Sequence, residues 1–122
     1  MVLYFATDLL WASRIKATAD AIGVSCRPVR SVEMLEARLA DSAPTAILVD
    51  LTTPPVAMAL IHRLRNPERD AGVPRVRIVA FGPHVEKELL QQARDAGADE
   101  VLPRGALDRN LEEILLGLAA RS

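Results

Sequence analysis

Three nearly continuous apolar runs constrain the fold of this chain more than any other feature of its sequence. They cover residues 2–6, 46–51 and 76–81. A strand with one face in water alternates apolar and polar side chains, whereas a strand covered on both faces is apolar along its length. The runs therefore predict the central strands of a parallel sheet with helices on both faces.

Segments with helical spacing separate and follow these runs. Their apolar stripes are Ile15, Ala19 and Ile22; Val32, Leu35 and Leu39; Ala59, Leu60 and Leu64; Val85, Leu89, Ala93 and Ala96; and Leu111, Ile114, Leu115 and Leu118. Ser31 and Asp108 are expected to cap the second and the last helix, and Pro55 to lie in the first turn of the third. Gly23 and Gly97 are expected to end the first and the fourth helix.

Two shorter segments, residues 24–29 and 100–102, complete the alternation of strand and helix. Pro28 has no backbone N–H for a central ladder, which places the first of these segments at an edge of the sheet. A βα unit repeated five times predicts a three-layer α/β architecture. With 122 residues and no linker, the chain is expected to form one domain over residues 1–122.

Composition narrows the classes of function. The 15 Lys and Arg residues balance 16 Asp and Glu residues, and aromatic residues make up 3% of the chain, so no nucleic-acid partner is expected. Acidic residues interrupt the arginines between residues 63 and 77, which predicts a solvated rim. No segment is apolar over the roughly 18 residues of a membrane span, and no basic segment precedes the first apolar run. We therefore expect no membrane partner and a cytoplasmic location.

For Cys26 and Trp11 the sequence predicts the surroundings of the side chain but no functional role. Cys26 is the single cysteine, so no intramolecular disulfide can form, and we expect it to be buried like a small apolar residue. Leu9, Leu10 and Trp11 open the first helix as three consecutive apolar residues, and not all of them can face the core. Trp11 is expected to pack in the core or at its edge.

Two motifs carry a resemblance to a known family. The first is AGADEVLPRGAL at residues 96–107, followed by DRNLEEILLGL at 108–118, and the second is AILVDLTTPP at 46–55. Together they resemble the receiver domain of two-component response regulators, over essentially the whole chain. The resemblance implies a flavodoxin-like fold with a five-stranded parallel sheet of order 2-1-3-4-5 and five helices.

The resemblance also places a candidate site. Asp50, at the end of the third strand, corresponds to the phosphoacceptor of the family. In the family, a pair of acids after the first strand binds the Mg²⁺ that screens the incoming phosphoryl group. An ungapped alignment through Gly23 places Ala6 and Thr7 at that pair, and a shift of one residue places Thr7 and Asp8 there. At least one acid is missing in either alignment.

Other positions of the resemblance have changed as well. The family's hydroxyl residue after the fourth strand corresponds to Gly82, its lysine after the fifth strand to Arg104, and its aromatic switch residue to Val101. A bidentate pair between Arg104 and the Asp50 carboxylate is expected to hold that carboxylate. These changes predict a degenerate site, in which Asp50 is not phosphorylated and no metal or cofactor binds.

The leading hypothesis is a pseudo-receiver, a signalling module that is not an enzyme and acts by protein–protein interaction. The resemblance implies a docking face made by the fourth helix, fifth strand and fifth helix, with exposed Gln91, Gln92, Asp95 and Arg109, and a homodimer is possible. One alternative is an atypical receiver that is phosphorylated on Asp50 with Asp8 as its metal ligand. The other is a small-ligand carrier on a flavodoxin-like fold, although the chain has no glycine-rich phosphate-binding motif.

Overall fold

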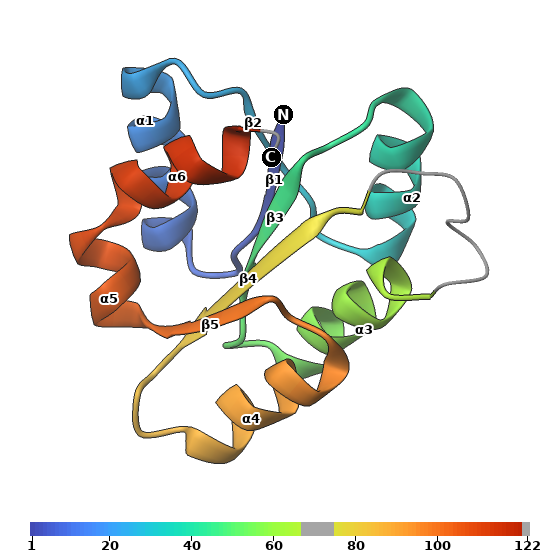
Figure 1. Cartoon of the computed structure of the whole chain (residues 1–122), viewed down its shortest axis with the longest axis vertical. Coiled ribbons are helices and arrows are strands. Elements are labelled where there is room, and N and C mark those ends of the chain that lie inside the picture. The colour runs from blue at the N-terminus through green and yellow to red at the C-terminus, as the bar shows by residue number, and fades with distance from the viewer. Residues whose placement is uncertain (67–74, 121–122) are drawn as a thin grey trace.

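The computed structural model describes residues 1–66 and 75–120, in which strands and helices alternate (Figure 1). The strands are β1 (Val2–Phe5), β2 (Cys26–Pro28), β3 (Ala46–Asp50), β4 (Arg77–Gly82) and β5 (Glu100–Pro103). The helices are α1 (Leu9–Ile22), α2 (Val32–Asp41), α3 (Pro54–Leu64), α4 (Lys87–Ala96), α5 (Arg104–Arg109) and α6 (Leu111–Ala119). The segment 67–74, which belongs to a loop expected at residues 66–74, lies outside the described residues.

The five strands form one parallel sheet in the order β2-β1-β3-β4-β5, which confirms the predicted fold class and strand order. Pro28 lies in the edge strand β2, as its missing N–H requires. The carboxyl end of β3 lies between those of β1 and β4 at the middle of the sheet. Side chains that follow these strands therefore share one edge, where open α/β sheets bind their ligands.

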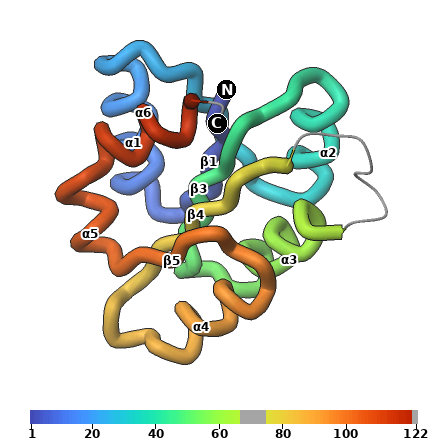
Figure 2. The backbone as a smooth tube through the Cα atoms, in the orientation of Figure 1, coloured from blue at the N-terminus to red at the C-terminus, as the bar shows by residue number. Residues whose placement is uncertain are grey.

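The sheet has a helical layer on each face, as the backbone tube shows (Figure 2). Leu3, Ile47 and Ile78 belong to the core shared with α2, α3 and α4. Their strand neighbours Val2 and Leu48 belong to the core on the other side, which α1, α5 and α6 cover. Because both faces of each central strand are buried, both sets of alternating positions are apolar, and this accounts for the continuous runs.

Most of the predicted helix boundaries are confirmed. The Ser31 hydroxyl accepts a hydrogen bond from Met34 N at 3.1 Å and caps α2. Gly23 and Gly97 follow α1 and α4 with φ of 75° and 116°, a left-handed conformation that favours glycine. Pro55 lies in the first turn of α3.

The prediction of five helices is wrong, because the described residues form six. The additional helix is α5, in the segment before the expected last helix, and it is divided from α6 at Asn110, whose side-chain Nδ2 donates to the Ala106 carbonyl at 3.1 Å and competes with the helical backbone bonds. Asp108 therefore lies inside α5 and does not cap the following helix. Its carboxylate pairs with Arg14 of α1 at 2.5 Å.

The predicted apolar stripe of α4 is partly wrong. Val85 precedes the helix and is 69% exposed, whereas the buried positions of α4 are Leu90 and Ala93. The stripe thus begins one turn later than the spacing indicated. Cys26 is buried, as expected, and burial raises the pKa of its thiol to about 11. Among the helices of the described residues, none combines the length and the apolar character of a membrane span.

The expected solvated rim of arginines is confirmed for Arg75 and Arg77, which are exposed, and is wrong for Arg63 and Arg65. Arg63 pairs with Glu36 of α2, and its side chain is only 12% exposed. Arg65 donates to the Gly97 and Val76 carbonyls, each at 2.8 Å, and to the Asp99 carboxylate at 2.5 Å. Burial lowers the pKa of the Arg65 guanidinium, and the charge of Asp99 opposes that shift. Arg63 thus joins α3 to α2, and Arg65 joins the end of α3 to the residues that precede β4 and β5. The local sequence around these arginines could not predict these contacts, because the partners are far apart along the chain.

Candidate functional site

Asp50 ends β3 at the carboxyl edge of the sheet, as the sequence predicted. Its strand partner is Phe81 of β4, and its side chain has no exposed surface. It is the one buried charged residue among residues 1–66 and 75–120. Burying a carboxylate costs free energy unless other groups compensate for its lost hydration. The groups that surround Asp50 therefore define the site.

Thr52 provides most of that compensation. Its backbone N–H and its hydroxyl both donate to Asp50 Oδ1, at 2.9 and 2.6 Å. The hydrogen bonds from the residue two places on resemble the Asx turns that aspartate forms at the start of loops. The other oxygen, Asp50 Oδ2, is buried and has no hydrogen-bond partner in the described part of the chain. Only half of the carboxylate is therefore satisfied.

Arg104 approaches the same carboxylate from the start of α5, directly after β5. Its Nη2 donates to the Thr52 hydroxyl oxygen at 2.5 Å and lies 4.0 Å from Asp50 Oδ1. The expected bidentate pair is wrong, because the Thr52 hydroxyl stands between the two charges and bonds to both. Arg104 Nε is buried without a hydrogen-bond partner among the described residues. The result is a chain of contacts from Asp50 through Thr52 to Arg104.

The loop after β1 holds the positions that the resemblance assigned to an acid pair. Ala6 is half-buried, and its side chain has no atom that could bind a metal ion. The Thr7 hydroxyl lies 3.0 Å from that of Thr53, in the loop after β3. Asp8 is the N-cap of α1, with Oδ1 accepting from Leu10 N at 2.9 Å. Asp8, the acid nearest to these positions in the sequence, therefore already serves as the N-cap of α1.

Gly82 ends β4 at the same edge and is buried. A Cβ added there would meet Leu51 Cβ at 3.4 Å and Leu90 Cδ2 at 3.5 Å, which is ordinary van der Waals contact. The Cβ of an alanine would therefore fit. Gly82 contributes no hydroxyl to the site.

These residues do not fit the magnesium centre that the resemblance implies. Mg²⁺ requires near-octahedral oxygen ligands, commonly including one or two carboxylates. In the ranges that the structure describes, no three His, Cys, Asp or Glu side chains gather closely enough to hold an ion. Asp50 supplies one unpartnered oxygen, and Asp8 caps α1. No step of a mechanism can be built on a metal here.

The site can hold charge and position two loops, but it exposes no carboxylate oxygen to an incoming group. The hydrogen bond between Arg104 and the Thr52 hydroxyl connects the start of α5 to the loop after β3. The sequence reasoning named Asp50 and Arg104 but missed Thr52 and Thr53. A hydroxyl residue two places after an aspartate at a strand end was the available signal, because it allows such a turn.

Four polar residues were predicted to be exposed on the docking face. Gln91, Gln92, Asp95 and Arg109 are all exposed, as expected. On α4, Gln91 Nε2 donates to Asp95 Oδ1 at 2.9 Å, which satisfies part of the surface within the helix.

No protein-family model and no curated protein matches this chain. Solved structures do resemble it. A signal receiver domain of a response regulator from Bermanella marisrubri superimposes with a TM-score of 0.76 at 22% identity, over 98% of this chain and 97% of that one. The receiver domain of Saccharomyces cerevisiae Ssk1, crystallised with the histidine phosphotransfer protein Ypd1, gives 0.75 at 16% identity, over 98% and 90%.

A third similar structure is NtrX from Brucella abortus, with a TM-score of 0.71 and 16% identity over 96% of this chain. The matched region is 26% of the NtrX chain, so this chain spans about a quarter of that regulator. At such identities the superpositions establish the fold and leave the chemistry to the residues described above. The chain has the fold of response regulator receiver domains.

Proposed function

We propose that residues 1–122 form a single pseudo-receiver domain, a signalling module that works by protein–protein interaction in the cytoplasm. It transmits a signal without accepting a phosphoryl group and without acting as an enzyme. The receiver fold supports the role in signal transduction, and the surroundings of Asp50 support the loss of phosphotransfer.

The single observation that carries the proposal is the burial of Asp50. Phosphoryl transfer to a carboxylate depends on access to an oxygen and on cations that neutralise the developing charge. Asp50 has no exposed surface, and Thr52 occupies its Oδ1. At least one acid of the metal-binding pair is missing, whether the pair corresponds to Ala6 and Thr7 or to Thr7 and Asp8, so the carboxylate has neither the access nor the charge compensation.

Arg104 takes a structural role in this proposal. Its guanidinium reaches the Thr52 hydroxyl from the fifth βα unit and remains 4.0 Å from Asp50. The contact fixes the start of α5 relative to the loop after β3. The domain therefore holds one arrangement of these loops and presents a constant surface to its partner.

The partner in this proposal is a protein. The Ssk1 receiver domain is bound to a histidine phosphotransfer protein in its crystal structure, so a receiver fold can bind another protein. We propose as the docking surface the face of α4, β5 and the segment of the expected fifth helix, which the structure divides between α5 and α6, with Gln92 and Arg109 among its exposed polar residues. Polar side chains at such an interface favour a reversible complex.

Magnesium titration tests the degenerate site directly. Trp11 is the only tryptophan and packs against Phe81, the strand partner of Asp50, so its fluorescence reports on this edge. We expect no saturable change up to millimolar Mg²⁺ at constant ionic strength. A matched variant, Ala6→Asp with Thr7→Asp, restores the acid pair and is expected to gain a saturable response.

A saturable Mg²⁺ response in the wild-type protein that disappears in Asp8→Ala would contradict the proposal. Asp8 would then be a metal ligand in addition to a helix cap, and the atypical receiver phosphorylated on Asp50 would become the better description. Circular dichroism of the Asp8→Ala variant separates loss of a ligand from loss of α1, since removing an N-cap typically costs about 1 kcal/mol.

A further inference from the structure

The start of α1 exposes two large apolar side chains that the proposed function does not use. Leu9 is 79% exposed and Leu10 is 78% exposed, the highest values for large hydrophobic residues in the described ranges. Three consecutive apolar residues at the start of a helix, Leu9, Leu10 and Trp11, cannot all face the core. The structure resolves that conflict by burying part of Trp11 against Phe81 and leaving both leucines in water.

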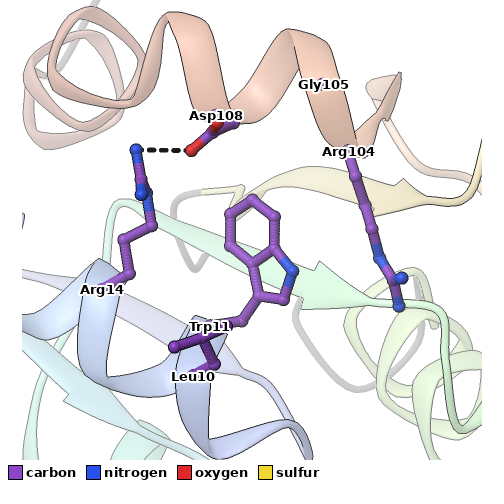
Figure 3. A pocket seen from close by; sticks show the side chains of 6 residues that line it. All are labelled: Leu10, Trp11, Arg14, Arg104, Gly105 and Asp108. Carbon is purple, nitrogen blue, oxygen red and sulfur yellow. Dashed lines mark ion pairs between the residues drawn. The ribbon is translucent and has the colours of Figure 1, made fainter.

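The two leucines form a ridge with a hollow on each side. Leu10 lines a groove of about 390 Å³ between α1 and α5, together with Trp11, Arg14, Arg104, Gly105 and Asp108 (Figure 3). Leu9 lines a second hollow of about 290 Å³, towards β2. Each volume is several times the roughly 30 Å³ of one water molecule, so an apolar side chain can enter.

The first groove has an apolar floor and a charged rim. In Figure 3 the indole of Trp11 stands from α1 towards α5, and the Arg14–Asp108 ion pair lies beside it. Both members of that pair are about half exposed, at 52% and 46%. The rim therefore carries one accessible positive and one accessible negative charge.

The patch combines a ridge, a groove and both signs of charge, which are the features that a contact between two identical copies needs. A two-fold axis brings the same patch of two copies together, so a patch that contains both a projection and a hollow can fit itself. The rim adds one arginine and one aspartate from each copy, and the whole chain carries a net charge of −1, so no strong repulsion opposes the approach. A patch of one charge sign would instead favour a different partner of opposite sign.

We propose that the Leu9–Leu10 ridge and the adjacent groove bind a second copy of this chain. The ridge of one copy enters the groove between α1 and α5 of the other, and Arg14 of each faces Asp108 of its counterpart. This interface shares α5 with the proposed α4–β5–α5 face and Arg104 with the Asp50 site, but its main contacts come from α1, and it does not require Asp50 to accept a phosphoryl group. Its failure would leave the proposed pseudo-receiver function untouched.

Analytical ultracentrifugation of the full chain, from micromolar to millimolar concentration, tests the interface. We expect a concentration-dependent dimer in the wild-type protein. Leu10→Glu places a charge in the groove and is expected to weaken the dimer by about tenfold or more. Val85→Glu is the matched control, because Val85 is 69% exposed and lines neither hollow, and it is expected to change the dimer constant less than about twofold.

A charge exchange identifies the contact itself. Arg14→Asp alone and Asp108→Arg alone place like charges across the two-fold axis and should each be monomeric. Mixed in equal amounts, the two variants restore opposite charges in both contacts and should form a heterodimer. A wild-type protein that stays monomeric at millimolar concentration, a dimer that Leu10→Glu leaves intact, or a mixture that stays monomeric would each overturn the proposal.

Discussion

Two arginine–aspartate pairs lie at opposite ends of the same parallel sheet, and they differ in how fully their polar atoms are used. At the amino ends of β4 and β5, Asp99 accepts from Arg65 and from Ile78 N at 2.8 Å and also pairs with Arg75 at 2.6 Å. At the carboxyl ends, Asp50 keeps one buried oxygen without a partner, and Arg104 remains 4.0 Å away.

The difference separates a structural pair from a site. A buried polar atom without a partner costs free energy, and folded proteins retain few such atoms. The Arg65–Asp99 network satisfies its groups and joins α3, β4 and the loop before β5. The Asp50–Arg104 pair leaves unsatisfied atoms at the edge where α/β sheets bind ligands. We therefore expect the first pair to stabilise the fold, and we infer that the second is a remnant of function.

Removal of the Asp99 charge should lower the free energy of unfolding more than any other substitution considered below. Asp99→Asn leaves Arg65, whose side chain is only 14% exposed, beside a neutral amide and also weakens the contact with Arg75. Breaking a partly buried pair on one side should cost about 3 kcal/mol of unfolding free energy, the low end for buried pairs. Urea denaturation measures it, and a loss below about 1 kcal/mol would show that the network is not structural.

Substitution of Gly97 tests the packing around the same arginine. Gly97→Ala places a Cβ 2.7 Å from Arg65 Cγ in a left-handed conformation, whereas the matched Gly23→Ala has the same type of backbone and no atom within 4 Å. In each variant the left-handed conformation of the alanine costs about 1–2 kcal/mol of unfolding free energy. The Gly97 variant should lose about 1 kcal/mol more, since Arg65 must shift. Equal losses in the two variants would mean that Arg65 moves freely.

Removal of the Asp50 charge should have a smaller effect than removal of the Asp99 charge, although Asp50 is more deeply buried. Asp50→Asn keeps an acceptor for Thr52 and relieves a carboxylate oxygen that has no partner. The unfolding free energy should change by less than about 1 kcal/mol in either direction. A loss as large as that of Asp99→Asn, in the same urea experiment, would show that both pairs are structural.

The rate at which maleimide labels Cys26 compares the two substitutions at a residue that is far from both pairs in the sequence. Because burial raises the pKa of this thiol to about 11, only about one in a thousand is ionised at pH 8, and maleimide must wait for the chain to open. Asp99→Asn should speed the labelling, and Asp50→Asn should leave it near the wild-type rate. Fast labelling of the wild type at pH 8 would contradict the burial of this strand.

The sequence predicted the parallel sheet and most helix ends, because these depend on local apolar periodicity, glycine and proline, whereas the strand order was implied by the resemblance to receiver domains. It placed Asp50, Gly82 and Arg104 at one edge, since strand ends determine that placement. It did not predict the division at Asn110, which depends on one side-chain hydrogen bond. It also missed the Arg65–Asp99 network and the Thr52 bridge, because long-range contacts of arginine and hydroxyl groups leave no periodic signal.

The central claim is that Asp50 is a carboxylate that no longer accepts phosphate. Intact mass spectrometry after incubation with acetyl phosphate and Mg²⁺ tests it most directly, with Asp50→Asn as the control. We predict no phosphoryl adduct on either protein, because Asp50 is buried, is bonded to Thr52 and has no acid pair beside it. A phosphoryl adduct on the wild-type protein that is absent from Asp50→Asn would contradict the account.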